Sequence, residues 1–413
     1  MSGSDTYTRW AVLAAGEGGG RIASNLFGRA DNPGIDDRIL VMNTNRADIR
    51  NTIDRMEAET TIDTESIELN HTVTFGDLDG VGNYFPGGEA CAEADLDRII
   101  EQLDAAEVEN ADAFLYVTTL GGGTGNGSVP YLINSLKSNP PSAALDDTIH
   151  VALAAWPYSH EGGQRHFNAV CGLSRLLRWY DGSQNADMVV LISNSHIADD
   201  AGFEDVVDPD GDRYSTVNEM AISAMDLMIG AGRETRGVVD VSDYVTWPSR
   251  LDAYHFTPGV ALEQPSVFEL DLLFDKAADN GFVPLDPTTS RVVYGIVRAP
   301  THLVEQGEYS EAELDAALHE WLDANGYDDI VHRMTTLTPV DRRDDTLDVL
   351  LMFGGFDLDP LLSESRTSFD AIMEQATERG IQSDVDTPGE EFSTDRFRAI
   401  RRNLEDYLSA SRG

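Results

Sequence analysis

The stretch Leu120-Gly121-Gly122-Gly123-Thr124-Gly125-Asn126-Gly127-Ser128 decides the fold of this chain. It follows a run of β-branched and aromatic residues at 114–119 and precedes an apolar-periodic segment that starts at Val129. This order predicts a buried strand, a glycine loop and a helix. Glycines let a backbone approach a ligand closely, and the N-terminus of a helix carries partial positive charge. We therefore predict a phosphate cradle here. The alternative, a flexible glycine linker, would not join a strand to a helix.

The first apolar run of the chain spans residues 9–15, and a second glycine turn follows it. Its sequence is Gly16-Glu17-Gly18-Gly19-Gly20-Arg21, and an apolar-periodic helix comes after it. A dinucleotide-binding enzyme would have a glycine in place of Arg21, and an acidic residue after the strand at 39–42, where this chain has Asn43. Nucleotide-dependent oxidoreduction is therefore a weak hypothesis.

Two further strand ends carry polar residues suited to a nucleotide. The strand at 149–156 ends in Pro-Tyr-Ser-His-Glu-Gly-Gly-Gln-Arg, which places Glu161 and Arg165 one helical turn apart. The carboxylate can accept hydrogen bonds from ribose hydroxyls, and the guanidinium can reach the same nucleotide. A surface salt bridge is the alternative. The strand at 188–192 ends at Asn194, an amide suited to a purine edge.

Tyr214 and Asn218 lie four residues apart at the start of an apolar helix, after an acidic insertion at 199–212. This spacing places both on one helix face. An aromatic ring can stack on a purine, and an amide can donate to and accept from guanine. A core tyrosine and a helix cap are the alternative.

These motifs, in this order, resemble the FtsZ/tubulin superfamily over roughly residues 8–365. GGGTGNG resembles the family's GGGTG(S/T)G, GEGGGRI its first loop and NTN its second loop. The segment at 157–165 is similar to that of FtsZ, whereas Y-x-x-x-N-E is similar to tubulin. The third loop, residues 79–88, matches poorly, and we assign no contacts to it. The segment at 237–244 resembles N-x-D-x-x-D, with Val238 in place of the asparagine.

The resemblance implies an α/β fold: a Rossmann-like nucleotide-binding domain with a mostly parallel sheet, a long central helix and a smaller α+β C-terminal domain. We expect the GTP-binding domain at 8–212, the connecting helix at 213–236 and the C-terminal domain at 237–365, with strands near 260–262, 291–298, 330–337 and 346–353. A tail at 366–413 would hold a helix, an acidic linker and a basic amphipathic segment.

The resemblance also implies a GTPase that assembles head to tail into filaments serving cell division or cell shape. The cofactors would be GTP or GDP with Mg²⁺ held by Glu17, and K⁺ is a further candidate cation. Asp240 and Asp243 would complete catalysis on the nucleotide of the next subunit. A non-hydrolysing GTP-binding scaffold or regulator is the alternative, because Val238 and the third loop depart from the family. The nucleotide contacts implied are those of Gly16, Glu17, Gly18, Gly19, Arg21, Asn43, Gly121, Gly122, Gly123, Thr124, Gly125, Asn126, Glu161, Arg165, Asn194, Tyr214 and Asn218.

The charge of the chain is extreme, with 73 acidic residues against 29 basic ones and a formal net charge of −44. Such self-repulsion is screened in molar salt, where the Debye length is about 3 Å, so we infer a salt-loving host. The resemblance of the motifs implies that this host is archaeal. Lysine is scarce in this chain, and codon bias in a GC-rich genome would also explain that scarcity. This excess of negative charge disfavours nucleic-acid partners, because they carry negative phosphates themselves. With no membrane-spanning run or signal peptide, we expect a cytoplasmic protein.

The tail at 395–408 places apolar residues on one helical stripe, with four arginines around its first half. It could bind a partner protein or a membrane surface, or fold back onto the body. We predict that removing residues 395–413 leaves GTP binding intact and alters at most assembly or localisation. A truncated protein that cannot fold would instead show that the tail is core.

Overall fold

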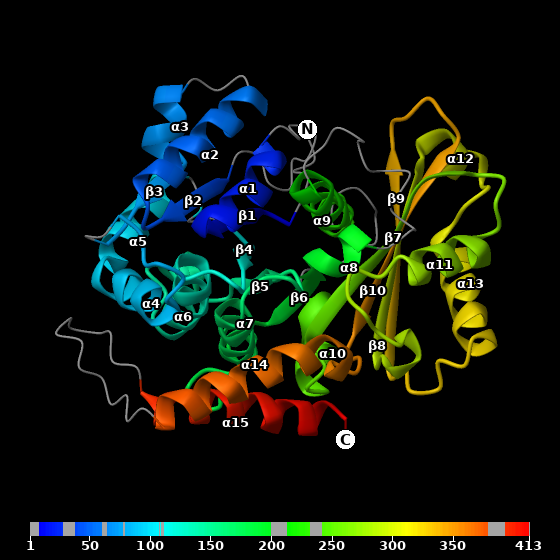
Figure 1. Ribbon diagram of the computed structural model, residues 1–413. Coiled ribbons are helices and arrows are strands. Elements are labelled where there is room, and N and C mark those ends of the chain that lie inside the picture. Colours follow the sequence, from blue (N-terminus) through cyan, green and yellow to red (C-terminus); the bar gives the residue numbers. More distant parts are fainter. Residues whose placement is uncertain are drawn as a thin grey trace.

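The computed structural model describes residues 8–27, 38–59, 64–76, 79–106, 108, 111–199, 213–231, 242–378 and 393–412. Within these ranges the strands form one ten-stranded sheet in the order β3-β2-β1-β4-β5-β6-β7-β10-β8-β9 (Figure 1). The strands are β1 (Trp10–Ala15), β2 (Ile39–Asn43), β3 (Thr72–Thr74), β4 (Ala113–Thr119), β5 (Ile149–Trp156), β6 (Met188–Ser193), β7 (His255–Pro265), β8 (Val292–Pro300), β9 (His332–Val340) and β10 (Thr346–Gly354).

The strands from β3 to β6 are parallel, and helices cover both faces. Their apolar runs are buried on both sides, as parallel strands require. Helices α1, α2 and α9 lie on one face; α4, α6 and α7 lie on the other, with α14 and α15 against α7 (Figure 1). The helices of this half are α1 (Gly16–Phe27), α2 (Arg46–Glu59), α3 (Thr64–Asn70), α4 (Phe85–Ala94), α5 (Leu96–Ala105), α6 (Thr124–Ser138), α7 (Gly163–Leu177), α8 (Asn194–Asp199) and α9 (Arg213–Gly230).

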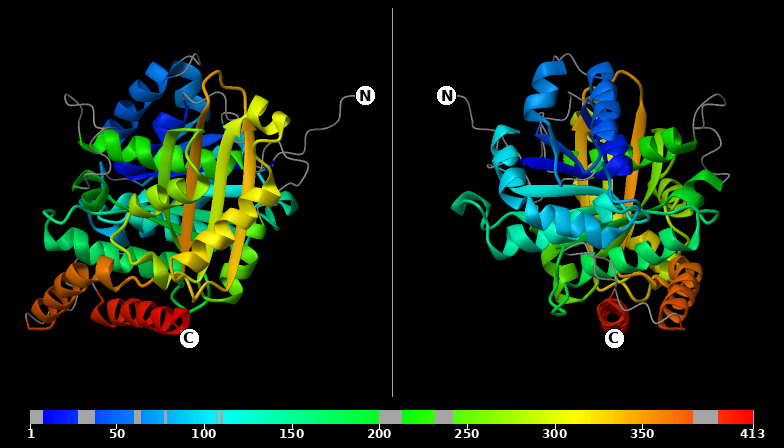
Figure 2. Two further views of the ribbon diagram at one scale, coloured as in Figure 1. Left: turned by 90° about the vertical axis from the view of Figure 1, so that its right-hand side faces the viewer. Right: turned by 60° about the vertical axis from the view of Figure 1, so that its left-hand side comes forward.

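The second half of the sheet continues the first, because β7 pairs in parallel with β6 through Val189 and Val190. Strand β10 runs antiparallel to β7 and β8, and β9 is parallel to β8 (Figure 2). The four strands expected here are confirmed, with bounds shifted by a few residues and β7 much longer. The helices are α10 (Asp243–Arg250), α11 (Leu270–Asp279), α12 (Thr301–Gln306), α13 (Glu311–Ala324), α14 (Asp359–Glu378) and α15 (Thr394–Ser411).

The C-terminal helix α15 is part of the hydrophobic core. Its N-terminus is capped by Ser393, whose hydroxyl accepts a hydrogen bond from the backbone of Arg396. The apolar stripe is buried, and the ring of Phe397 packs edge-on against Phe85 and Phe167. The stripe comprises Phe397, Ile400, Leu404, Tyr407 and Leu408, each at most 4% exposed. Of the three alternatives, folding back onto the body is confirmed, and the tail is core. The stripe is not available to a partner or a membrane, because the protein's own body covers it.

The arginines of α15 mostly pair with acids of the same chain. Arg396 contacts Glu89 of α4 at 2.7 Å, and Arg401 contacts Asp370 of α14 at 3.3 Å. These pairs join arginines of α15 to acidic residues on the rest of the protein. The basic character of this segment is therefore explained by its packing against the same chain. Among the described residues, no helix is both long and apolar enough to cross a bilayer.

A buried histidine joins α15 to the sheet and makes stability depend on pH. The Nε2 atom of His255 lies 2.8 Å from the carbonyl of Phe356, so it donates there, and Nδ1 accepts from the Tyr407 hydroxyl at 2.7 Å. Burial lowers the pKa of His255 from 6.5 to about 4, partly offset by the Phe356 hydrogen bond and by Asp357. The folded state thus disfavours protonation.

We expect this histidine to weaken the protein as pH falls from about 6.5 toward 4. In that window the unfolded chain binds a proton that the folded chain does not, which costs up to about 1.4 kcal/mol per pH unit. Thermal melts of wild type and His255→Gln between pH 7.5 and 5 measure the effect. The variant should show the shallower pH slope. Equal slopes for the two proteins would contradict the assignment.

Candidate functional site

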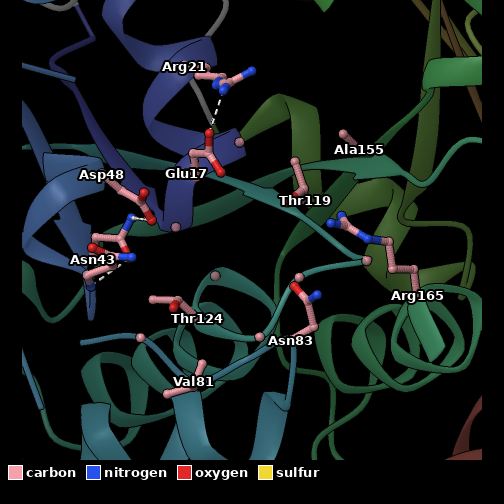
Figure 3. Close-up of a pocket in the computed structure, with 18 of the residues that line it drawn as sticks. Glu17, Arg21, Asn43, Asp48, Val81, Asn83, Thr119, Thr124, Ala155 and Arg165 are labelled. Carbon is pink, nitrogen blue, oxygen red and sulfur yellow. Dashed lines mark hydrogen bonds and ion pairs between the residues drawn. The ribbon is translucent and has the colours of Figure 1, made fainter. Parts of the chain in front are cut away.

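A cavity of about 570 Å³ opens at the carboxyl ends of the parallel strands (Figure 3). Ligands of open α/β sheets bind at this edge. Its walls come from the turns after β1, β2, β4, β5 and β6, from α9, and from the loop before α4. The lining residues are Gly16, Glu17, Gly18, Arg21, Ile22, Asn43, Asn45, Asp48, Asp79, Gly80, Val81, Gly82, Asn83, Thr119, Gly121, Gly122, Gly123, Thr124, Gly125, Ala155, Pro157, Glu161, Arg165, Asn194 and Asn218.

The predicted cradle forms the floor of this cavity. Strand β4 ends at Thr119, residues 121–123 form the loop, and α6 begins at Thr124. Glycine is required at position 125, because a Cβ there would lie 2.3 Å from the carbonyl oxygen of Ala15. The glycine turn after β1 and the cradle therefore pack backbone to backbone. The N-terminus of α6 faces the cavity with its partial positive charge.

The loop after β2 is tied to the cradle by a hydroxyl pair. Thr44 Oγ1 lies 2.7 Å from Thr124 Oγ1, and both residues are buried. Asn43 shapes this loop, since its Oδ1 accepts from the backbone of Asn45 at 3.1 Å and its Nδ2 donates to Asp48 at 3.3 Å. Asn45 and Asp48 also line the cavity, although our sequence reasoning did not single them out.

Two carboxylates lie on the side of the cavity formed by α1 and α2. Glu17 pairs with Arg21, its neighbour one helical turn on, as Figure 3 shows. The pKa of Asp48 is raised, mainly by burial and further by the charge of Glu17, while the Asn43 hydrogen bond and Arg21 oppose the shift. No group of three His, Cys, Asp or Glu side chains suited to a metal occurs among the described residues. A cation here would thus use one or two carboxylates plus ligand oxygens, which is how Mg²⁺ is commonly held.

The third loop, whose contacts the sequence left open, covers the cradle. Residues 79–83 all line the cavity, and Asn83 adopts a left-handed φ of 61°. The loop touches the cradle directly: a Cβ on Gly123 would lie 2.8 Å from the backbone nitrogen of Tyr84 and 2.7 Å from a methyl of Val81. This close packing explains the glycine at position 123.

The predicted ribose pair lies at the wall after β5. Arg165 Nη1 is 3.2 Å from Glu161 Oε1, and the other oxygen of Glu161 accepts from the backbone of Tyr158 at 2.9 Å. Arg165 is 41% exposed in its side chain, so the pair stays accessible from the cavity. The salt bridge and the ligand interpretation are therefore compatible.

The two asparagines that we expected to contact the guanine base lie in a further wall of the cavity. Asn194 begins α8, and Asn218 lies on α9; both line the cavity. The backbone of Tyr214 belongs to α9, but its side chain falls outside the described residues.

Two predicted contacts face the protein instead of the cavity. Asn126 is fully buried and donates to the carbonyls of Leu120 and Asn168, and a Cβ on Gly19 would lie 2.4 Å from the carbonyl of Val117. Neither residue lines the cavity, because both lie in the first turn of a helix and face the neighbouring elements.

Asp243, one of the two predicted catalytic acids, does not line this cavity. Asp243 is the first residue of α10 and is exposed, and its charge opposes the burial that lowers the pKa of His332. Asp240 lies outside the described residues.

A parallel sheet with a glycine cradle and polar pairs at its carboxyl edge is typical of nucleotide-binding α/β proteins. Residues 9–202 match the model of the Tubulin/FtsZ family, GTPase domain. It is 27% identical over 240 residues to the tubulin-like protein CetZ2 of Haloferax volcanii, covering 57% of this chain and 58% of CetZ2. The chain thus matches a little over half the length of this curated relative.

Solved structures show the same fold. The GDP-bound CetZ1 monomer of Haloferax volcanii has a TM-score of 0.68 at 19% identity, covering 88% of this chain and 99% of CetZ1. The GTPγS-bound CetZ2 protofilament of the same organism has a TM-score of 0.66 at 20% identity, covering 89% and 99%. The expected tubulin/FtsZ fold is confirmed.

Proposed function

We propose that the protein binds GTP or GDP in the cavity at the carboxyl ends of the strands and assembles head to tail with copies of itself. The observation that carries this proposal is the convergence of seven chain segments on one cavity, where a glycine cradle, an acid and arginine pair, and two asparagines are among the lining groups. The relatives solved with GDP and GTPγS, one of them as a protofilament, support the same ligand and assembly.

Each wall has a distinct role in this proposal. The backbone of residues 121–125 and the N-terminus of α6 would hold the phosphates. Glu161 would accept from the ribose, while Asn194 and Asn218 would recognise the guanine edge with Tyr214. Bound Mg²⁺ would neutralise phosphate charge, and Glu17 and Asp48 are the carboxylates placed to hold it; K⁺ is a second candidate cation.

Hydrolysis needs a positioned water and a carboxylate to orient it or take its proton. Asp243, which is exposed at the start of α10, would meet the nucleotide of an adjacent subunit, and the resemblance implies the same role for Asp240. Such head-to-tail contacts do not close on themselves, so they generate filaments. A GTP-binding scaffold without turnover is the second candidate, because Val238 replaces the asparagine of the family loop.

Asp243→Ala is expected to leave GTP affinity unchanged and to slow phosphate release about a hundredfold or more, since a lost general base typically costs that much. Its filaments should persist in sedimentation assays. Asp271→Ala, which removes an exposed acid from the first turn of α11, serves as the matched control. Near wild-type turnover in Asp240→Ala and Asp243→Ala would show that this loop does not complete the site.

A further inference from the structure

Asn168 of α7 lies beneath the junction of the cradle and the third loop. Its side chain is fully buried and lies outside the cavity lining. The Nδ2 atom is 2.7 Å from the carbonyl oxygen of Asn83, 3.1 Å from that of Gly121 and 3.3 Å from that of Gly122. One side-chain amide therefore holds carbonyls from two loops that the chain separates by about forty residues.

The orientation of this amide follows from its neighbours. Gln164 Nε2 donates to Asn168 Oδ1 at 3.1 Å, which leaves the NH₂ group of Asn168 for the three carbonyls. The backbone carbonyl of Asn168 in turn accepts from Asn126 Nδ2 at 2.8 Å, and the same nitrogen donates to Leu120 O at 2.6 Å. Asn126 is itself oriented by Arg175, which can only donate and lies 2.9 Å from its Oδ1.

This arrangement fixes the direction of the cradle's N–H groups. The carbonyls of Leu120, Gly121 and Gly122 are all drawn toward Asn126 and Asn168, on the protein side. In a trans peptide the N–H of the next residue points the opposite way, and the described chain has no cis bond. The N–H groups of Gly121 and Gly123 therefore turn toward the cavity that these glycines line.

We propose that Asn168 is a positioning residue for phosphate binding: it holds the cradle N–H groups toward the ligand and clamps the third loop onto the cradle. The inference rests on the proposed GTP site and adds to it a residue that never touches the nucleotide. Its effect should depend on phosphates, because the base and ribose walls contact other segments. The loss of affinity on mutation should thus grow from GMP to GDP to GTP.

The test is calorimetric titration of the full chain with GTP, GDP and GMP in molar KCl. Asn168→Ala should weaken GTP about tenfold or more and leave GMP affinity nearly unchanged, because the loop carbonyls lose their partner. Gln164→Leu, at an exposed position, should show the same order with a smaller loss. Asn185→Ala is the matched control: its buried amide also donates to two carbonyls, those of Pro130 and Arg175, away from the loops.

The possible results distinguish a failure of the proposed GTP binding from a failure of the positioning role of Asn168. If wild type binds no GTP, the proposed function fails. If wild type binds GTP but Gln164→Leu and Asn168→Ala weaken all three nucleotides equally, or weaken none, the positioning role is wrong. Amide hydrogen exchange without nucleotide gives a second readout: in both variants, residues 79–84 and 120–125 should exchange faster than in wild type and in Asn185→Ala. Unchanged exchange in these segments would also overturn the inference.

Discussion

Gly123→Ala is expected to abolish measurable GTP binding. The added Cβ would lie 2.7 Å from Val81 Cγ2, 2.8 Å from Tyr84 N and 3.0 Å from the carbonyl carbon of Asn83. Two of these atoms belong to backbone, so the third loop must separate from the cradle. The structure thus places the clash between the two loops. We expect affinity to fall about a hundredfold or more, equivalent to ~2.7 kcal/mol.

The matched control for this change is Gly162→Ala. That glycine follows Glu161, and a Cβ there would meet no atom within 4 Å. Both variants should keep a cooperative melt, so that binding is compared between folded proteins. Wild-type affinity in a folded Gly123→Ala protein would show that the contact between the loops does not govern the site.

Removal of residues 394–413 is expected to prevent folding. The deletion removes five buried apolar side chains of α15 and exposes the surface that covers them. Burial of each side chain stabilises the fold by about 1.5–3 kcal/mol, or about 8–15 kcal/mol together. The whole stability of a domain is commonly about 5–15 kcal/mol. It also removes Arg396 from Glu89, and Glu89 is the partner of the fully buried Arg175 at 2.8 Å.

Circular dichroism and size exclusion in molar KCl measure this outcome. Leu404→Ala should destabilise the full chain by about 2–5 kcal/mol, whereas Arg402→Ala, on the exposed side of the same helix, should change little. A truncated protein that melts cooperatively and binds GTP would contradict the assignment of α15 to the core.

The parts of the fold that the sequence predicts are those with strong local patterns. Apolar runs followed by glycine turns mark β1, β4 and the start of α6, and several independent motifs in one order indicate the family. The cavity then collects Glu17, Asn43, Glu161, Arg165, Asn194 and Asn218 from five separate segments. Those side chains directly follow strand ends, or lie on one face of a helix, so spacing alone indicates their direction.

Other features depend on contacts between distant segments and could not be read from spacing. Asn168 lies mid-helix with no motif around it, and its partners are 47 and 85 residues away. The stripe of α15 predicts a buried face but not what covers it; the aromatic pair of Phe167 and Phe397 decides that. Asp48 carries no signal beyond an acid in the first turn of a helix.

We propose that the GTP site of each subunit is completed by the acidic loop of its neighbour in the filament. The GTP turnover of the wild-type protein tests this proposal most directly. Phosphate release and sedimentation should be measured with GTP in molar KCl across protein concentration. We predict that release per molecule rises with concentration as filaments pellet, because each site needs the acidic loop of its neighbour. GTP that binds without turnover, or a rate per molecule independent of concentration, would contradict the account.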